Sequence, residues 1–431
     1  MNSLNCFINS PKIPLTMNKR TILINIKDLI GTQGENQAHS DSIDMNALNT
    51  ISNAYLIIEQ DKIIDFGKMK DLKLESDSSN ELIDVKNKSV LPCWNDSHTH
   101  LVFAGTREQE FVDRINGLSY QEIALKGGGI LNSAKKLANT SFSELYDSAA
   151  TRLEKVMKMG TGAIEIKSGY GLSLENEIKM LKVAAKLKEN YSIPIKTTFL
   201  GAHAVPEAYR GNKKGYVDNI INEMIPNIAK EKLADYIDIF CETNYFSVED
   251  MHAILAAGKK HQLKPKVHVN QFTSIGGIQK AIEFDALTVD HLEVLTQKDI
   301  DSLKEARTIP TLLPSCSLFI NIPYAKGKTL LENNIPFALA SDYNPGSTPC
   351  GNMNLVVSLA CINMKINPEA AINAATIMGA AAMELENQLG TIKKGKLANI
   401  ILTEEISSYN FIPYSFGENN IDRVMIKGNW V

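Results

Sequence analysis

Short apolar runs alternate with amphipathic stretches through the middle of this chain. The runs have the length and β-branched content of buried strands, and the stretches between most of them repeat apolar residues at helical spacing. The predicted strands are Ser89–Leu91, Ala163–Ile166, Ile195–Leu200, Tyr236–Phe240, Lys266–Val269, Leu287–Val289, Thr308–Leu313 and Phe337–Ala340. The predicted helices are Ser143–Met159, Leu174–Asn190, Ser247–Gln262, Gly276–Glu283 and Lys326–Asn333. Strand and helix units in this order, over roughly 270 residues, predict an α/β fold, a (β/α)₈ TIM-like barrel.

Both ends of the chain have a different pattern, made of short strands and turns. The N-terminal part contains Thr21–Asn25 and a hairpin of Tyr55–Glu59 with Ile63–Gly67, and the C-terminal part contains Gly395–Leu402 and Arg423–Gly428. Neither end has enough strands for a stable sheet alone. We therefore expect one small β-sandwich domain built from residues 20–88 and 388–431, a barrel over residues 89–387, and a disordered extension over residues 1–19.

A doubly wound sheet is the structural alternative to the barrel. That fold binds dinucleotides through a Gly-rich fingerprint between a strand and a helix. Gly127-Gly128-Gly129 follows no clear strand and has the character of a flexible loop. The barrel is the better prediction.

Polar residues follow most of the predicted strands, at the barrel face where catalytic groups are found. In chain order they are His98 and His100, Lys167-Ser168-Gly169-Tyr170, His203, Cys241-Glu242, His268, Asp290-His291 and Ser341-Asp342. Five of the eight histidines lie in this set. A single histidine of this kind is usually a satisfied core residue, but coincidence explains five on one face poorly.

The residue types at this face predict a metal site. His98 and His100 are one residue apart, so an extended chain directs both imidazoles to the same side. With His268 and Asp342 they supply three imidazoles and one carboxylate, and a water would complete an open site. A bound metal makes hydroxide available at neutral pH, Asp342 could take the proton, and His291 could stabilise the oxyanion.

Two neighbouring carboxylates bear on this metal site. Asp96 could orient one imidazole through its second nitrogen. Two-metal barrels often carry a lysine on strand four, and here that strand ends at Cys241-Glu242 instead. A single ion is therefore predicted, with Glu242 as a bridging carboxylate left open.

Composition excludes several other classes of function. The net charge of −4, with no dense Lys/Arg stripe, gives no footprint for nucleic acid. No apolar stretch approaches the ~20 residues of a membrane span. The six cysteines are scattered without CxxC pairs, which favours a reducing, cytoplasmic location over a disulfide framework.

The order HxH, His, His, Asp resembles the amidohydrolase superfamily, and more particular stretches are similar to its imidazolonepropionase family. These are Asp96–Phe103, Gly105-Thr106-Arg107, Gly127–Ile130, Glu165–Gly171, Gly201-Ala202-His203 and Ser341–Ser347. The resemblance covers about Leu23 to Gly428. It implies hydrolysis of the cyclic amide C–N bond of 4-imidazolone-5-propanoate to N-formimidoyl-L-glutamate, a step of histidine degradation, by metal-activated hydroxide.

The resemblance also implies a ligand set, a substrate-binding set and a homodimer. His98, His100, His268 and Asp342 would hold one Zn²⁺ or iron ion. The positions that would contact the small-molecule substrate are Arg107, Tyr120, Tyr170, His203, Gln271, Asn344, Gly346 and Ser347. The guanidinium fork of Arg107 suits the substrate carboxylate, and the two tyrosines suit its flat ring.

Gln271 departs from part of the family, because some members have a glutamate there that could act as an acid or base. Glutamine cannot titrate, so we expect it to hydrogen-bond only, leaving acid–base work to Asp342 and His291. A deaminase of guanine or cytosine from the same superfamily is the alternative enzyme, and Gln271 argues against it because deaminases generally have a glutamate there. A barrel that only binds a ligand is the alternative outside catalysis, and it predicts no tightly held metal.

Overall fold

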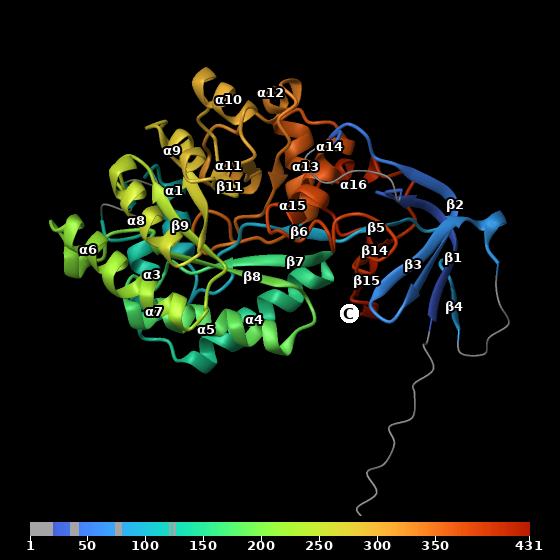
Figure 1. Cartoon of the computed structure of the whole chain (residues 1–431), viewed down its shortest axis with the longest axis horizontal. Helices are drawn as coiled ribbons and strands as arrows, with labels where there is room; N and C mark the ends of the chain where they lie inside the picture. Colours follow the sequence, from blue (N-terminus) through green and yellow to red (C-terminus); the bar gives the residue numbers. More distant parts are fainter. Residues whose placement is uncertain (1–19, 35–42, 74–79, 120–121, 124–125) are drawn as a thin grey trace, which may run out of the picture.

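The computed structural model describes residues 20–34, 43–73, 80–119, 122–123 and 126–431, and eight parallel strands in it form a barrel (Figure 1). In chain order these are β6 (Trp94–Asp96), β7 (Thr161–Lys167), β8 (Ile195–Ala202), β9 (Tyr236–Cys241), β10 (Lys264–Val269), β11 (Thr288–His291), β12 (Ile309–Leu312) and β13 (Ala338–Leu339). Each strand pairs with its sequence neighbour. The predicted (β/α)₈ barrel is confirmed.

The barrel closes just beyond the ends of its first and last strands. Asp342 donates its backbone N–H to the His98 carbonyl at 3.0 Å, and His100 donates to the Tyr343 carbonyl at 2.9 Å. Thr99 and Tyr343 form a parallel bridge at the same place. The seam of the barrel therefore consists of the two segments that carry three of the four predicted metal ligands, His98, His100 and Asp342.

Charged side chains fill the barrel interior. Glu165 of β7 contacts Lys266 of β10 at 2.7 Å, and Lys167 of β7 contacts Asp290 of β11 at 3.4 Å. These strands are not neighbours in the sheet, so their side chains meet only across the interior. All four residues are fully buried.

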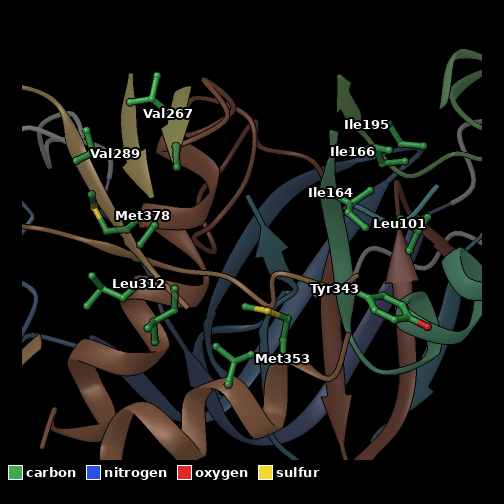
Figure 2. Packing of buried hydrophobic residues seen from close by; sticks show 14 of the residues in the cluster. Leu101, Ile164, Ile166, Ile195, Val267, Val289, Leu312, Tyr343, Met353 and Met378 are labelled. Carbon is green, nitrogen blue, oxygen red and sulfur yellow. The ribbon is translucent and has the colours of Figure 1, made fainter. Parts of the chain in front are cut away.

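The alternate residues of the same strands are apolar and face the helices. Figure 2 shows Ile164 and Ile166 of β7, Val267 of β10 and Val289 of β11 in one core that also contains Met378. Because side chains alternate across a strand, an apolar outer face implies that the polar positions point inward. The hydrophobic core of this domain lies between barrel and helices, and the interior is left to polar chemistry.

Helices surround the barrel and connect its strands (Figure 1). Those up to the last barrel strand are α1 (Glu108–Ile115), α3 (Ile130–Ala138), α4 (Phe142–Lys158), α5 (Leu174–Asn190), α6 (Lys213–Asn219), α7 (Ile225–Lys230), α8 (Val248–Lys260), α9 (Gly277–Glu283), α10 (Gln297–Lys304), α11 (Pro314–Ile320) and α12 (Gly327–Glu332). After it come α13 (Met353–Asn363), α14 (Pro368–Ala375) and α15 (Ile377–Ala381), and α16 (Phe411–Tyr414) of the C-terminal segment packs on α13. The predicted helices correspond to α4, α5, α8, α9 and α12 and are confirmed. None of the helices in the described residues has both the length and the apolar character that crossing a bilayer requires.

Several barrel helices begin at a capping box, which fixes the residue at which the helix starts after the preceding loop. Ser141 before α4, Ser247 before α8 and Thr296 before α10 each accept a hydrogen bond from the third helical residue, whose carboxylate bonds back to the cap. This reciprocal pair satisfies two otherwise orphaned backbone donors. The sequence thus sets the start of these helices locally.

Strands from both chain ends form a second, separate sheet. Its members are β1 (Arg20–Ile30), β2 (Thr50–Glu59), β3 (Lys62–Lys68), β4 (Glu81–Asp84), β5 (Val90–Pro92), β14 (Ile400–Thr403), β15 (Ile421–Ile426) and β16 (Asn429–Trp430). The sheet is continuous, and both chain ends contribute to its one core, through Leu23 and Leu56 from the N-terminal part and Ile400 and Met425 from the C-terminal part. The expected small β-domain from both termini is confirmed. The expected disordered extension, residues 1–19, lies outside the described residues.

The first barrel strand differs from its prediction. The apolar run Ser89–Leu91 was expected to open the barrel, but β5 pairs with β1 and β14 of the terminal sheet, and β6 opens the barrel instead. That prediction is wrong. An apolar run predicts a buried strand without saying which of two sheets will bury it.

Cys93, between β5 and β6, lies tightly against Gly162 of β7. A Cβ added to Gly162 would lie 2.3 Å from the Cys93 Cβ. We expect Gly162→Ala to lower the unfolding free energy by about 1–3 kcal/mol, the usual cost of overpacking a rigid contact. Urea denaturation measures this effect. Gly34→Ala is the control, because its Cβ would meet nothing within 4 Å, and equal stability of the two variants would contradict the prediction.

Candidate metal centre

Three predicted ligands converge at the barrel seam. His98 Nε2 lies 3.5 Å from Asp342 Oδ1, and His100 Nε2 lies 3.7 Å from the same oxygen. Two atoms bound to one tetrahedral ion at ~2.1 Å stand about 3.4 Å apart. The separations are therefore those of ligands that share an ion.

Two more imidazoles complete the group. The His268 ring centroid lies 4.5 Å from that of His98 and 5.4 Å from that of His100. One ligand atom each of His98, His268 and His291 lies within 4.8 Å of the others. The cluster brings together the four predicted ligands and also includes His291.

Carboxylates from the barrel interior hold two of these rings. His98 Nδ1 lies 2.7 Å from Asp290 Oδ2, and His268 Nδ1 lies 2.8 Å from Asp238 Oδ2. A carboxylate accepts a hydrogen from Nδ1 and so leaves the Nε2 lone pair for a metal. Asp96 was expected to orient a ring and does not. It accepts the backbone N–H and the hydroxyl of Ser341 instead.

The imidazoles of the cluster are in the neutral form that can bind a metal cation. Burial, followed by neighbouring positive charge, lowers the pKa of His98, His100 and His268 well below the ordinary value, so these rings are neutral at pH 7. His98 Nε2 is buried and has no hydrogen-bond partner among the described residues. An unpartnered lone pair aimed at a carboxylate is expensive unless an ion lies between them. The donor set suits zinc or ferrous iron equally.

Asp342 is held by a tight turn that follows it. Ser347 donates its hydroxyl to Asp342 Oδ2 at 3.1 Å, and the Asn344 side chain bonds the Asp342 carbonyl. Asn344 Oδ1 accepts the backbone N–H groups of Gly346 and Ser347, both at 2.8 Å. This network fixes the carboxylate and presents polar groups beside it.

Left-handed backbone occurs at several strand ends around the cluster. Asp342 has φ 54°, Asn270 after β10 has φ 57°, and His291 and Leu292 have φ 88° and 63°. Such conformations cost about 1–3 kcal/mol each in non-glycine residues and gather where function demands a particular side-chain direction. The strain aims the strand-end side chains into the site.

A small cavity of about 30 Å³ lies among these groups. Its walls are His100, Ile130, Tyr170, His203, Phe240, His268, Gln271, His291, Asp342, Asn344 and Ser347. His203 stacks on His100 with ring centroids 5.1 Å apart, and Gln271 Nε2 donates to Cys316 Sγ at 3.5 Å. Seven of the residues expected to bind substrate or catalyse thus line one space: Tyr170, His203, Gln271, His291, Asp342, Asn344 and Ser347.

A second, larger cavity has a volume of about 510 Å³. Arg107 lines that cavity together with Pro345. A Cβ on Gly346 would lie 2.0 Å from Arg107 Nη1, so the guanidinium rests directly on the glycine backbone. Arg107 Nε donates to Glu110 Oε2 at 2.8 Å, which orients the side chain. Only glycine leaves this space for the arginine.

The remaining expectations have other outcomes. Tyr120 lies outside the described residues. Glu242 accepts hydrogen bonds from the backbone of Phe272 and Thr273 and belongs to none of the described clusters able to hold a metal. Of the histidines left out of the site, His252 and His261 are exposed.

Sequence reasoning missed the residues that support the ligands. They are Asp238, which contacts His268 Nδ1, and Glu293, which contacts His291 Nδ1. The buried charges Glu165 and Lys266, which pair with each other, were missed too, and no role was predicted for Lys167 or Asp290. Glu293 Oε1 lies 3.4 Å from His291 Nδ1; although burial opposes the charge, this carboxylate raises the pKa of His291. The available signal was the presence of charged residues inside strands that would otherwise be continuously apolar.

Comparisons with known proteins agree with this architecture. The amidohydrolase family matches residues 89–431. Imidazolonepropionase of Christiangramia forsetii is 57% identical over 95% of this chain and 100% of its own length, and that of Clostridium tetani is 40% identical over 90% and 93%. Among solved structures, E. coli guanine deaminase matches with a TM-score of 0.72 and 14% identity, covering 96% of this chain and 99% of its own. At that identity the structural likeness concerns the fold alone.

Proposed function

Since this chain belongs to the imidazolonepropionase family of amidohydrolases, we infer that it hydrolyses 4-imidazolone-5-propanoate to N-formimidoyl-L-glutamate, a step of histidine degradation. The observation that carries the inference is 57% identity to an imidazolonepropionase over 95% of the chain. The ligand cluster beside an arginine supports it, because the reaction needs an activated water and the substrate carries a carboxylate.

The amidohydrolase family is metal-dependent, and we propose that His98, His100, His268 and Asp342 hold one Zn²⁺ or iron ion. An ion bound there lowers the pKa of a water ligand to roughly 7 and polarises a carbonyl. The neutral imidazoles and the unpartnered His98 Nε2 support this assignment.

Asp342 carries out the proton transfers, and His291 stabilises the oxyanion. Asp342 accepts the proton of the attacking water as oxygen adds to the ring carbonyl carbon. His291 donates a hydrogen bond to the oxyanion, a role favoured by its raised pKa beside Glu293. The ring C–N bond then breaks, and the departing nitrogen receives a proton from Asp342 and leaves within an amidine.

Binding falls to the groups around the two cavities. Arg107 pairs with the propanoate, while Tyr170 and His203 flank the ring. Gln271, Asn344 and Ser347 hydrogen-bond the ring and its substituents, and we assign Tyr120 to the same role. The substrate exceeds the small cavity of about 30 Å³, so its tail extends toward the larger cavity that Arg107 lines.

Gly346→Ala should weaken substrate binding through Arg107. The added Cβ would overlap the guanidinium and displace it. We expect KM to rise by about 10- to 100-fold, the worth of a charged hydrogen bond, with a smaller change in kcat. Steady-state kinetics measures both constants.

Arg107→Met is the matched comparison for that variant. It should raise KM by a similar factor, and the double variant should be no worse than Arg107→Met alone, because both changes remove one interaction. An unchanged KM in Gly346→Ala, or additive losses in the double variant, would contradict the assignment.

Metal affinity should fall at acid pH. Burial raises the pKa of Asp342 to about 6 in the metal-free protein. Protons therefore compete with the ion for this carboxylate below about pH 6, whereas an ordinary aspartate would lose its charge nearer pH 4. Chelator competition at pH 5.5, 6.5 and 7.5 measures the effect, and constant affinity down to pH 5.5 would count against Asp342 as a ligand.

An activity assay separates this function from deamination. We expect metal-loaded protein to consume imidazolonepropanoate, followed by its absorbance, and chelator to stop the reaction. Guanine and cytosine should release no ammonia, because Gln271 cannot protonate a leaving amine. Ammonia release without ring opening of imidazolonepropanoate would overturn the proposal.

We also propose that the chain forms a homodimer in the cytoplasm. The family resemblance supports the dimer, and the scattered free cysteines support a reducing compartment. Light scattering after gel filtration tests the dimer, and cell fractionation tests the location.

A further inference from the structure

A buried lysine lies directly beneath the metal ligands, at the centre of a cluster of carboxylates. Lys167 Nζ is 2.8 Å from Glu165 Oε1, 2.9 Å from Asp238 Oδ2 and 3.4 Å from Asp290 Oδ2. All four side chains have no exposed surface. One ammonium therefore joins three carboxylates from three strands where solvent cannot screen their repulsion.

Two of these carboxylates are the ones that hold ligand imidazoles. Asp290 Oδ2 contacts His98 Nδ1 at 2.7 Å, and Asp238 Oδ2 contacts His268 Nδ1 at 2.8 Å. In each case the oxygen that faces the imidazole is the same one that faces Lys167. A shift of Lys167 would therefore move both carboxylates and, with them, the imidazoles of His98 and His268.

The hydrogen bond at Nδ1 fixes the orientation of each imidazole and therefore the direction in which its Nε2 lone pair points. With Nδ1 bonded to the carboxylate, His98 directs Nε2 toward Asp342 Oδ1, 3.5 Å away. Without the ammonium, the carboxylates would repel one another and move apart. Each would take its imidazole along, and the Nε2 atoms would no longer point to one place.

We propose that Lys167 is a positioning residue that aligns His98 and His268 for the metal through Asp290 and Asp238. The inference rests on the metal site proposed above and adds to it a residue that contacts the carboxylates behind the ligands. It assigns to Lys167 a function that acts on two ligands together, in addition to neutralising buried charge.

Lys266 provides a matched control, because it neutralises the same cluster without touching a ligand holder. Its Nζ contacts Glu165 Oε2 at 2.7 Å and the carbonyl oxygens of Ala382 and Ser97 at 2.6 and 3.3 Å. It is fully buried, as Lys167 is. If Lys167 only balanced charge, the two lysines would be equivalent.

The test compares cobalt(II) binding by wild type, Lys167→Met and Lys266→Met. Chelator competition gives the Co²⁺ affinity, and the visible absorption of bound Co²⁺ reports ligand geometry independently of activity. Each outer-shell partner of a metal ligand contributes about 10- to 100-fold to affinity, and Lys167 supports two. We expect Lys167→Met to lose at least about 100-fold in affinity and to change the spectrum.

Lys266→Met should lose less than about 10-fold and keep the wild-type spectrum. Equal losses in the two variants, or a wild-type spectrum and affinity in Lys167→Met, would overturn the proposal. Wild-type protein that binds no Co²⁺ would instead overturn the metal site and this inference with it.

A second variant keeps the test decisive if Lys167→Met fails to fold. Lys167→Arg retains the charge but replaces the single ammonium with a larger planar fork that cannot make the same contacts. We expect folded protein, verified by circular dichroism, with weaker Co²⁺ binding and an altered spectrum. Wild-type behaviour of Lys167→Arg would show that charge alone suffices and would overturn the proposal.

Discussion

We expect His268→Ala to lose bound metal and more than about 10³-fold of kcat/KM while keeping its fold. The ring is one of three imidazoles in the proposed ligand set, and even outer-shell partners of a ligand are worth about 10- to 100-fold in affinity or activity. Loss of the ring also leaves Asp238 with its Lys167 contact but without the imidazole. Elemental analysis after gel filtration and kinetics at saturating metal measure the two effects.

His261→Ala is the control for that experiment. His261 ends α8 and is exposed, so its removal takes away an imidazole without touching the cluster. We expect wild-type metal content and activity. Full metal content in His268→Ala would contradict the proposed ligand set.

We expect Asp342→Asn to lower kcat by about 10²–10⁴-fold, the range attributable to general acid–base catalysis, and to weaken metal binding as well. The amide has the same shape but neither the charge that neutralises the ion nor the basicity that accepts the proton. Kinetics with the metal supplied in excess separates the loss of binding from the loss of proton transfer. Wild-type kcat under those conditions would exclude Asp342 as the proton acceptor.

Asp285→Asn is matched to this change in backbone conformation. Asp285 has φ 52° against 54° for Asp342, but it is exposed at the end of α9. It therefore controls for replacing aspartate by asparagine in left-handed backbone. We expect no change in activity or stability.

The barrel and its active face could be predicted because two local signals coincide. Apolar runs of strand length predict the strands, and the histidines that directly follow them predict which face of the barrel carries the site. Leu174–Asn190, for example, matches α5 residue for residue, since Ser173 caps an uninterrupted amphipathic stretch. The assignment of Ser89–Leu91 to the barrel failed because strand character carries no information on the pairing partner.

The support beneath the ligands could not be predicted from local pattern. Asp238 and Asp290 are single charges inside apolar strands. The imidazole that each one contacts depends on the register between neighbouring strands of the barrel, which local sequence does not reveal. Asp96 illustrates the difficulty, because it stands nearest to His98 in sequence and yet bonds Ser341 across the seam. The alternation of charged and apolar residues in β7 shows that side chains point inward, but not what they meet there.

The seam of the barrel has a consequence for biogenesis. His98 and His100 leave the ribosome early, whereas Asp342 and Tyr343, which meet them through backbone hydrogen bonds, follow only after the seven further strands that complete the barrel. A nascent chain therefore carries the first two donors long before the complete ligand set exists. If the proposed ligand set is right, metal loading is a late event in maturation, and an ion held by His98, His100 and Asp342 would fasten the first strand to the last.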